Sequence, residues 1–306
     1  MRTAFVNQLL DIAANDSRVW LVNGDLGYKV LDSFREMFPE RFINAGVAEQ
    51  NMMGLSAGLA LSGKIVFVYS IANFPTFRCL EQIRNDICYH NVNVKIISVG
   101  AGYTYGSHGY THHGVEDMGI MRLLPNMRVV APGDPVEAEL ATKKAYKVQG
   151  PVYMRLGKAG EPILHKGTKP TFDFGSSITM SEGTDISLIA TGGVLELAVH
   201  ATESLQNAGI SVRLISMPCI KPFDQTTLLA AVNKSGGLIT LEEHALGGLA
   251  TCVSEVMAMN QIAIKYKPLY LSDDIIIQAG SQNDMRAQKG LTVENVTNVA
   301  RSMIAK

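Results

Sequence analysis

The chain has 306 residues, of which 47% are hydrophobic and 18% are charged, and its formal net charge is -1. This balance is typical of a globular protein that is long enough for two domain cores. It gives no broad basic field, which speaks against nucleic acid or an acidic membrane surface as a partner.

The N-terminal segment "MRTAFVNQLLDIAANDSRVW" predicts an amphipathic helix that runs into a strand. It lacks the apolar core and the small-residue cleavage site of a signal peptide, and no apolar run is long enough to span a bilayer. The four cysteines are scattered and form no CxxC pair, which favours buried thiols over disulfides or a zinc site. We therefore expect a cytoplasmic protein.

Strands and helices alternate through the first half of the chain. Short β-rich runs predict strands over 19–24, 64–70, 94–100, 127–132 and 151–156. Helical patterns fall between them, over 48–61, 77–90, 116–124 and 135–148. Near-continuous apolar strands separated by helices predict an α/β fold, with a parallel sheet covered on both faces.

This pattern fails from about residue 157 to 182, where Gly, Pro, Lys and Ser predominate as in a linker. A second α/β pattern follows, with strands over 185–193, 210–218 and 236–244 and helices over 194–209 and 247–260. The sequence therefore predicts two parallel-sheet α/β domains, over 1–165 and 181–306, joined by a linker over 166–180.

Four loops stand out because functional residues in α/β sheets gather where strands end. They follow the first strand, the short run "RFIN", the strand over 64–70 and the strand over 94–100. Because these loops share one edge of the sheet, we expect their side chains to line one cleft. These side chains are Asp25, Glu49, the pair Phe74 and Phe77, and the cluster His108, His112 and His113.

Four ordered segments make the chain resemble a known family. They are "GVAEQNMMGLSAGLALSGKIVFV", "EQIRNDICYHNVNVKI", "THHGVEDMGIMRLLPNMRVVAPGDPVEAE" and "GPVYMRLGKAG". In this order and spacing they are similar to the C-terminal half of transketolase, a thiamine-diphosphate enzyme. The resemblance runs from about residue 3 to 302, and it is strongest to the small subunit of transketolases that are split into two chains. It implies the pyrimidine-binding domain followed by the transketolase C-terminal domain.

The resemblance implies a role for Glu49, which stands in an otherwise apolar stretch. In this family the Glu of GVAEQ shares a proton with N1′ of the cofactor's pyrimidine, which activates the cofactor. Such a proton needs apolar surroundings, which Met52 and Met53 would supply. From the residues alone, Glu49 could equally be an acid at a helix start, where the helix dipole favours it.

Three further residues match cofactor-binding positions of the family. Phe74 and Phe77 match two aromatic residues that flank the aminopyrimidine, although both could simply be core residues. Asp25 matches the family's "DL" loop near the thiamine ring, where an Asp beside glycines is also an ordinary turn residue.

The histidine cluster matches the part of the family that faces the substrate. His112 stands where a histidine binds or protonates the oxygen of the reacting carbonyl, and His113 lies beside it. His108 replaces an Asp that accepts a hydrogen bond from a substrate hydroxyl, so the resemblance implies an unusual sugar substrate. Arg155 and Lys158 lie where the family places phosphate-binding cations, or they are solvated linker charges.

The diphosphate and metal motif of the family, G-D-G followed by an Asn, is absent from the chain. We therefore expect no metal ligands here. A second, N-terminal subunit would hold the thiamine diphosphate's diphosphate and Mg2+, in an α2β2 assembly with sites between unlike chains.

The sequence thus predicts the C-terminal subunit of a two-chain transketolase that moves a two-carbon ketol unit between sugars. One alternative is the E1 beta subunit of a 2-oxo-acid dehydrogenase, which has the same domain order. "THHGVED" followed by "MRLGKAG" favours transketolase, because the dehydrogenase subunits usually end this domain in an acidic segment. A second alternative is a non-catalytic regulatory or nucleotide-binding module.

Overall fold

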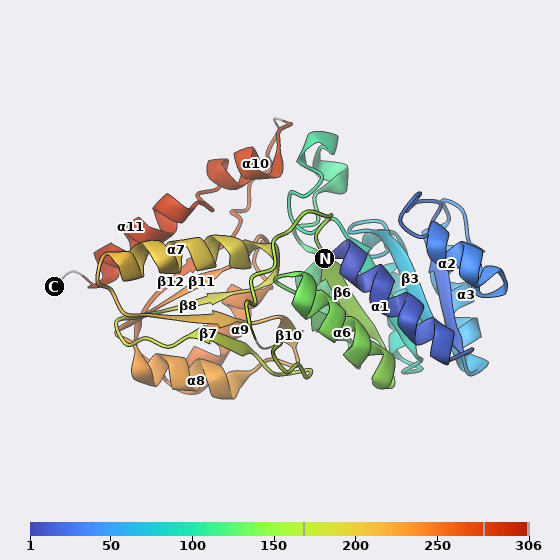
Figure 1. Cartoon of the computed structure of the whole chain (residues 1–306), viewed down its shortest axis with the longest axis horizontal. Helices are drawn as coiled ribbons and strands as arrows, with labels where there is room; N and C mark the ends of the chain where they lie inside the picture. Colours follow the sequence, from blue (N-terminus) through green and yellow to red (C-terminus); the bar gives the residue numbers. More distant parts are fainter. Residues whose placement is uncertain (168, 278, 305–306) are drawn as a thin grey trace.

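Two α/β units lie side by side along the long axis of the computed structural model, which describes residues 1–167, 169–277 and 279–304 (Figure 1). Each unit contains one sheet, and most strand pairings in both sheets are parallel. The predicted fold class, two parallel-sheet α/β units, is therefore confirmed. Residue 168 of the expected linker lies outside the described residues.

The first sheet has seven strands in the order β10-β5-β6-β4-β3-β1-β2. Its pairings are parallel except for the pairing of β10 with β5. The strands are β1 (Val19–Asn23), β2 (Phe42–Asn44), β3 (Ile65–Ile71), β4 (Val94–Val99), β5 (Arg128–Val130), β6 (Val152–Leu156) and β10 (Cys219–Lys221).

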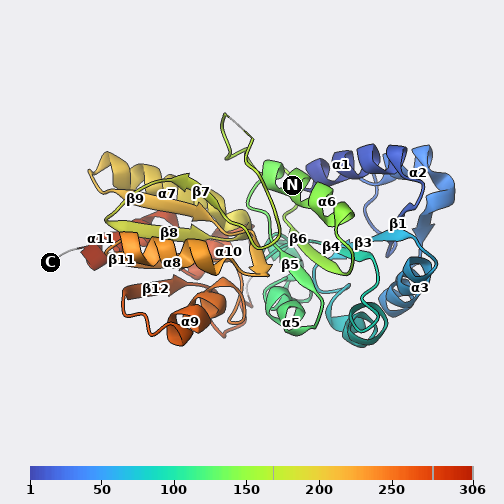
Figure 2. The same cartoon turned by 90° about the horizontal axis from the view of Figure 1, so that it is seen from below.

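Both faces of the first sheet are buried, which explains why its strands are apolar without interruption. Leu21 and Phe67 belong to a core cluster on the face that α1 and α6 cover. Their chain neighbours Val22 and Val68 belong to a second cluster on the opposite face, under α3. Figure 2 shows α1 and α6 on one side of these strands and α3 and α5 on the other.

The helices of the first unit largely match the predicted patterns. They are α1 (Arg2–Asn15), α2 (Asp32–Met37), α3 (Glu49–Leu61), α4 (Leu80–Gln82), α5 (Asp117–Leu123) and α6 (Pro135–Lys147), with short 3-10 turns η1 (Pro39–Arg41), η2 (Phe77–Cys79), η4 (Gly106–His108) and η5 (Tyr110–His112).

The segment expected as one helix over 77–90 is divided into three pieces. The 3-10 turn η2 leads into the short helix α4, and a π-helical segment, η3 (Ile83–Cys88), follows. The repeat of a π turn is wider than that of an α turn, so a single 3.6-residue pattern does not describe this segment. Segments of this kind often occur near functional sites.

The second sheet has five strands in the order β12-β11-β8-β9-β7, with β7 antiparallel to β9. The strands are β7 (Ile178–Ser181), β8 (Ile186–Ala190), β9 (Val212–Ser216), β11 (Gly237–Leu241) and β12 (Lys265–Leu269). The helical elements are η6 (Gly192–Val194), α7 (Leu195–Asn207), α8 (Gln225–Lys234), α9 (Leu249–Met259), α10 (Gln282–Gln288) and α11 (Val293–Ile304). Figure 1 shows α7 and α11 on one face of this sheet and α8 on the other.

One hydrophobic cluster spans the two units. Met118 and Met121 of α5 belong to the same cluster as Leu249 and Val253 of α9. Strand β10 comes after β9 in the chain, yet it joins the first sheet. The sequence-based boundaries at 165 and 181 stay a prediction, and the structure adds that strand pairing crosses them. None of the described helices combines the length and apolar character needed to cross a bilayer.

Candidate functional site

Glu49 is the first residue of α3 and sits where the loop after β2 ends. Its side chain is only 4% exposed, and Met52 and Met53 lie fully buried in the core below it. It borders an open hollow of about 530 Å³ lined by Arg78 and residues 47–51. A buried carboxylate at the edge of a hollow is a candidate for contact with a ligand, because burial is costly for an unpaired acid.

The carboxylate of Glu49 has a partner that the sequence did not predict. Nη1 of Arg78 lies 3.2 Å from Oε1 and 3.1 Å from Oε2 of Glu49. Arg78 belongs to η2, and its side chain is 47% exposed. The structure therefore adds a cation to the apolar surroundings that the sequence predicts for Glu49. The residues below the carboxylate are apolar, and a cation lies beside it.

Phe74 connects this ion pair to the histidine loop, residues 101–116. The guanidinium carbon of Arg78 lies 4.0 Å from the centroid of the Phe74 ring. The imidazole of His112 meets the same ring edge-on at 5.2 Å. Phe77 is 41% exposed, and no aromatic pair between Phe77 and Phe74 occurs in the described structure. Of the two predicted phenylalanines, the structure thus brings Phe74 together with Glu49 and His112.

The histidine loop is held in place from two directions. The side-chain amide of Asn73 donates to the carbonyl oxygens of Thr111 and His113, at 3.1 and 2.7 Å. On the other side the loop packs against the second unit, next to α10 (Figure 1). A Cβ at Gly106 would lie 2.6 Å from the carbonyl oxygen of Gly280, so this approach requires glycine.

His108 and His112 lie together at the exposed part of this loop. Their ring centroids are 5.1 Å apart, and Tyr105 packs 5.6 Å from His108. Burial lowers the pKa of His112, and the positive charges that His108 and His113 can carry lower it further. The lowered pKa favours the neutral imidazole of His112, which can both donate and accept a hydrogen bond.

His113 is placed differently from the other two histidines. It is 1% exposed, its Nε2 lies 3.3 Å from the carbonyl oxygen of Gly106, and its ring contacts Tyr103 edge-on at 5.1 Å. It therefore supports the loop from inside. The structure brings His108 and His112 together at the surface and leaves His113 behind them.

The two predicted phosphate-binding cations also separate. Arg155 lies on β6 and is 2% exposed. It donates to Asp117 and to the carbonyl oxygens of Gly114 and Glu243, so it joins the two units internally. Lys158 is exposed beyond the end of β6, and its Nζ lies 5.7 Å from the ring centroid of Tyr105. From Glu49 onward, the side chains described above form one continuous row of contacts. Of the two predicted cations, only Lys158 extends this row.

Asp25 lies in the loop after β1, in a left-handed backbone conformation with φ of 58°. Its carboxylate accepts hydrogen bonds from the Asn44 amide at 2.9 Å and the Tyr28 hydroxyl at 2.8 Å, and these bonds lower its pKa. Oδ1 of Asn44 accepts from the backbone amides of Asp25 and Gly46. Asn44, which the sequence analysis missed, thus ties the Asp25 loop to the loop that precedes Glu49.

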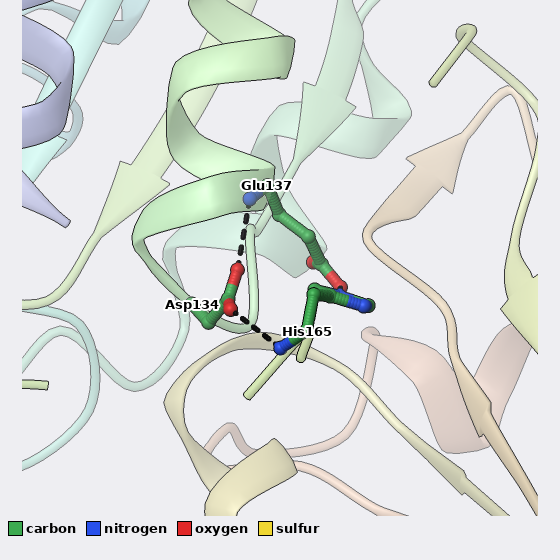
Figure 3. A group of neighbouring side chains, drawn as sticks. All are labelled: Asp134, Glu137 and His165. Atoms are coloured by element: carbon green, nitrogen blue, oxygen red, sulfur yellow. Dashed lines mark hydrogen bonds and ion pairs between the residues drawn. The ribbon is translucent and has the colours of Figure 1, made fainter. Parts of the chain in front are cut away.

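One group of acids and histidines in the described part of the chain is close enough to share a metal ion: Asp134, Glu137 and His165 (Figure 3). Its oxygens already accept hydrogen bonds. Asp134 accepts from the backbone amides of Glu137, Leu164 and His165. Glu137 accepts from the Gly133 amide and the Ser216 hydroxyl, and His165 Nε2 lies 2.8 Å away. We call this group the clasp, because its hydrogen bonds join the linker to the two units. These bonds suit that structural role better than the role of a metal site.

Comparisons with known proteins match the whole chain. Residues 1–160 match the family model "Transketolase, pyrimidine binding domain", and residues 175–296 match "Transketolase, C-terminal domain". The chain is 34% identical over 307 residues to an apulose-4-phosphate transketolase subunit of Phocaeicola vulgatus, covering 100% of this chain and 97% of the relative. It is 30% identical over 305 residues to the 6-deoxy-6-sulfo-D-fructose transketolase subunit SqwH of Clostridium sp., covering 99% and 94%.

A solved structure shares the same fold over nearly the full length. It is described as "Split gene transketolase, inactive beta4 tetramer", with a TM-score of 0.89 and 33% sequence identity. The match covers 99% of this chain and 97% of that chain.

Proposed function

Since this chain belongs to the transketolase family, we propose that it is the C-terminal subunit of a two-chain, thiamine-diphosphate-dependent transketolase that moves a two-carbon ketol unit between sugars. One observation of the structure supports this most. Buried Glu49 and Arg78 line one hollow, the guanidinium of Arg78 lies over the ring of Phe74, and His112 lies against that phenylalanine.

The side chains around this hollow fit the pyrimidine half of the cofactor. Glu49 would bond the ring nitrogen N1′, and the face of Phe74 would hold the ring by stacking. Phe77 and Asp25 are further proposed contacts, each at the edge of this region. When bound, thiamine diphosphate supplies the nucleophilic carbon that takes up the two-carbon unit.

The residues of this chain would then hold protons at two places. Glu49 would share a proton with the pyrimidine nitrogen, and its side chain lies over the fully buried Met52 and Met53. The lowered pKa of His112 favours its neutral form, which can donate to an oxygen of the reacting sugar or accept from one of its hydroxyls.

A partner chain would complete the site. The acids close enough to share a metal ion in the described residues lie in the clasp at Asp134 and Glu137, with their oxygens already bonded. The hollow itself offers Glu49 as its acid. We propose that an N-terminal subunit holds the diphosphate and Mg2+ in an α2β2 assembly. That a similar split-gene chain forms an inactive tetramer of beta subunits supports this need for an unlike partner.

The substrate is proposed to be a non-standard sugar. His108 and Lys158 place hydrogen-bond donors along the row beyond His112, and Lys158 adds a positive charge there. Such a wall favours a sugar with an acceptor or an anionic group, such as a phosphate or a sulfonate. The names of two relatives, which specify apulose 4-phosphate and 6-deoxy-6-sulfofructose, support this direction. His113 supports the loop, and Arg155 anchors it to the second unit.

The alternatives are less well supported. The full-length relatives reported above are transketolase subunits, which favours ketol transfer over the E1 beta reading. Glu49, Phe74 and His112 stand together in one row, which argues against a non-catalytic module. A cytoplasmic location stays part of this proposal.

The test uses the purified chain, a candidate partner that carries the G-D-G motif, and their mixture, each with thiamine diphosphate and Mg2+. We expect ketol transfer from a panel of ketose donors in the mixture only. The panel should contain xylulose 5-phosphate, apulose 4-phosphate and 6-deoxy-6-sulfofructose. Turnover by the chain alone would contradict the two-chain proposal.

A further inference from the structure

The side chain of Arg78 occupies the place that the proposed function gives to the aminopyrimidine ring. Its planar guanidinium lies 4.0 Å from the centroid of the Phe74 ring, and its Nη1 lies 3.1 Å from the carboxylate of Glu49. An aminopyrimidine would make the same two contacts, since it is also planar, stacks on an aromatic face and bonds an acid at its edge.

We propose that Arg78 is a placeholder, which pairs with Glu49 in the cofactor-free chain and must leave before the cofactor's pyrimidine can bind. This inference rests on the proposed function. It assigns Arg78 a positioning role, because Arg78 acts through Glu49.

The pairing has a clear cause in the cofactor-free chain. Glu49 is 4% exposed, and a buried carboxylate without a partner is strongly unfavourable. Every side-chain hydrogen bond that Glu49 accepts within the described residues comes from Arg78. Removing Arg78 should therefore destabilise the cofactor-free protein.

The ion pair between Arg78 and Glu49 also has a geometry that makes it easy to separate. Both carboxylate oxygens share a single nitrogen, Nη1, at 3.1 and 3.2 Å, instead of the two-nitrogen fork of a strong Arg–carboxylate pair. The side chain of Arg78 is half-exposed, and in the described part of the chain it hydrogen-bonds to no other residue. It can move into solvent without leaving another buried group unpaired.

The consequence is a competition at Glu49. Cofactor binding has to displace Arg78, so the apparent affinity of the free chain is lower than that of a chain whose site is already open. The contact that stabilises the empty site therefore lowers the affinity of that site for cofactor.

The test measures thiamine diphosphate affinity by calorimetric titration at fixed Mg2+, in the assembled two-chain complex. Arg78→Met keeps the length of the side chain and removes its charge and donors. Arg84→Met is the matched control, since Arg84 is exposed on η3 and its side chain, among the described residues, hydrogen-bonds only to its neighbour Asn85. We expect Arg78→Met to bind cofactor about tenfold more tightly than wild type, because the competitor is gone, and Arg84→Met to match wild type.

Thermal unfolding of the same variants gives a second readout. Arg78→Met should melt below wild type without cofactor, and saturating cofactor should close this gap. Unchanged or weaker affinity, or a gap that persists at saturation, would overturn the placeholder role. If wild type itself binds no thiamine diphosphate, the proposed function fails as well, whereas binding that Arg78→Met does not tighten contradicts the placeholder role alone.

Discussion

The imidazole of His112 meets the ring of Phe74 edge-on, with the two ring centroids 5.2 Å apart. This contact joins the loop after β3 to the loop after β4, so the proposed cofactor-binding and substrate-binding residues touch one another. A substitution of Phe74 should therefore affect both the proposed cofactor-binding residues and the proposed substrate-binding residues.

Phe74→Leu should weaken thiamine diphosphate binding by about fivefold, because an aromatic stack is worth roughly 1 kcal/mol beyond burial. Phe77→Leu is the matched control: Phe77 is 41% exposed and is not paired with Phe74 in the described structure, so we expect a smaller loss there. Calorimetric titration of the assembled complex measures both. Equal losses would show that the two phenylalanines flank the ring together.

Glu49→Gln should slow exchange of the C2 proton of bound thiamine diphosphate by about 10²-fold or more, the scale of a lost acid–base group. Glutamine keeps the shape of the side chain and removes the proton that Glu49 would share. Proton exchange followed by NMR measures the rate. Glu81→Gln, an exposed acid on α4, is the control and should exchange like wild type. Equal rates in Glu49→Gln and wild type would reduce Glu49 to an acid at a helix start.

His108→Asp should shift kcat/KM toward xylulose 5-phosphate and away from donors that carry an acceptor or anion at that position. Aspartate accepts a hydrogen bond from a sugar hydroxyl, whereas histidine donates a hydrogen bond in either of its protonation states. A polar mismatch of this kind can change kcat/KM by about 10²-fold or more. His90→Asp, at an exposed position outside the site, controls for surface charge. Wild-type complex with ordinary rates on xylulose 5-phosphate, unchanged in His108→Asp, would contradict the role of His108.

His165→Gln should make stability less dependent on pH. Burial opposes charge on His165, but the hydrogen bond to Glu137 and the nearby carboxylates raise the pKa of His165 above its ordinary value of 6.5. The pair of His165 and Glu137 therefore stabilises the folded protein fully below about pH 6.5. This stabilisation is lost as pH rises through the raised pKa of His165. We expect a loss of about 2 kcal/mol at pH 6 that shrinks toward pH 8.

Urea unfolding at several pH values measures the effect of His165→Gln. His200→Gln is its control, because His200 is exposed and only loosely paired with Glu203 at 3.5 Å. A loss at His165 that stays constant from pH 6 to pH 8 would show that the clasp is held without charge on the histidine.

Lys95→Met should make the stability of the protein depend less on pH in the alkaline range. Burial lowers the pKa of Lys95 to about 7 from its ordinary 10.5. The unfolded chain then binds more protons between these values, so wild-type stability should rise from pH 7 toward 10.5. In Lys95→Met this rise should be smaller, although the variant also removes donors to the carbonyl oxygens of Val148 and Gly150. Urea midpoints at pH 7 and 9.5 test this, with exposed Lys143→Met as control.

The central strands could be predicted from the sequence because burial on both faces leaves a continuous apolar run. The run over 64–70 became β3, Ile65–Ile71. The edge strands β12 and β10 could not. β12 has the sequence KYKPL, in which exposed lysines and a proline suit the edge of a sheet but hide the strand pattern. β10 has three residues, too few for any period to appear.

The candidate site was predictable in part, for a related reason. Glu49, Phe74, His108 and His112 follow strand ends, and strand ends of a parallel sheet meet at one edge. Arg78 gave no such signal, because its contact with Glu49 spans 29 residues and depends on how η2 turns. Arg155 lies within β6 and Lys158 lies beyond its end, so the strand boundary separates a buried cation from an exposed one.

The antiparallel strand β10 determines how this chain can be dissected. A fragment that ends at the linker would keep every residue of the candidate site, yet it would lose the strand that covers the edge of β5. An uncovered edge offers free backbone groups to any other strand, and so promotes aggregation. The two halves of the sequence are therefore not independent folding units. A division of the enzyme between two chains leaves this contact intact, whereas a cut within this chain would break it.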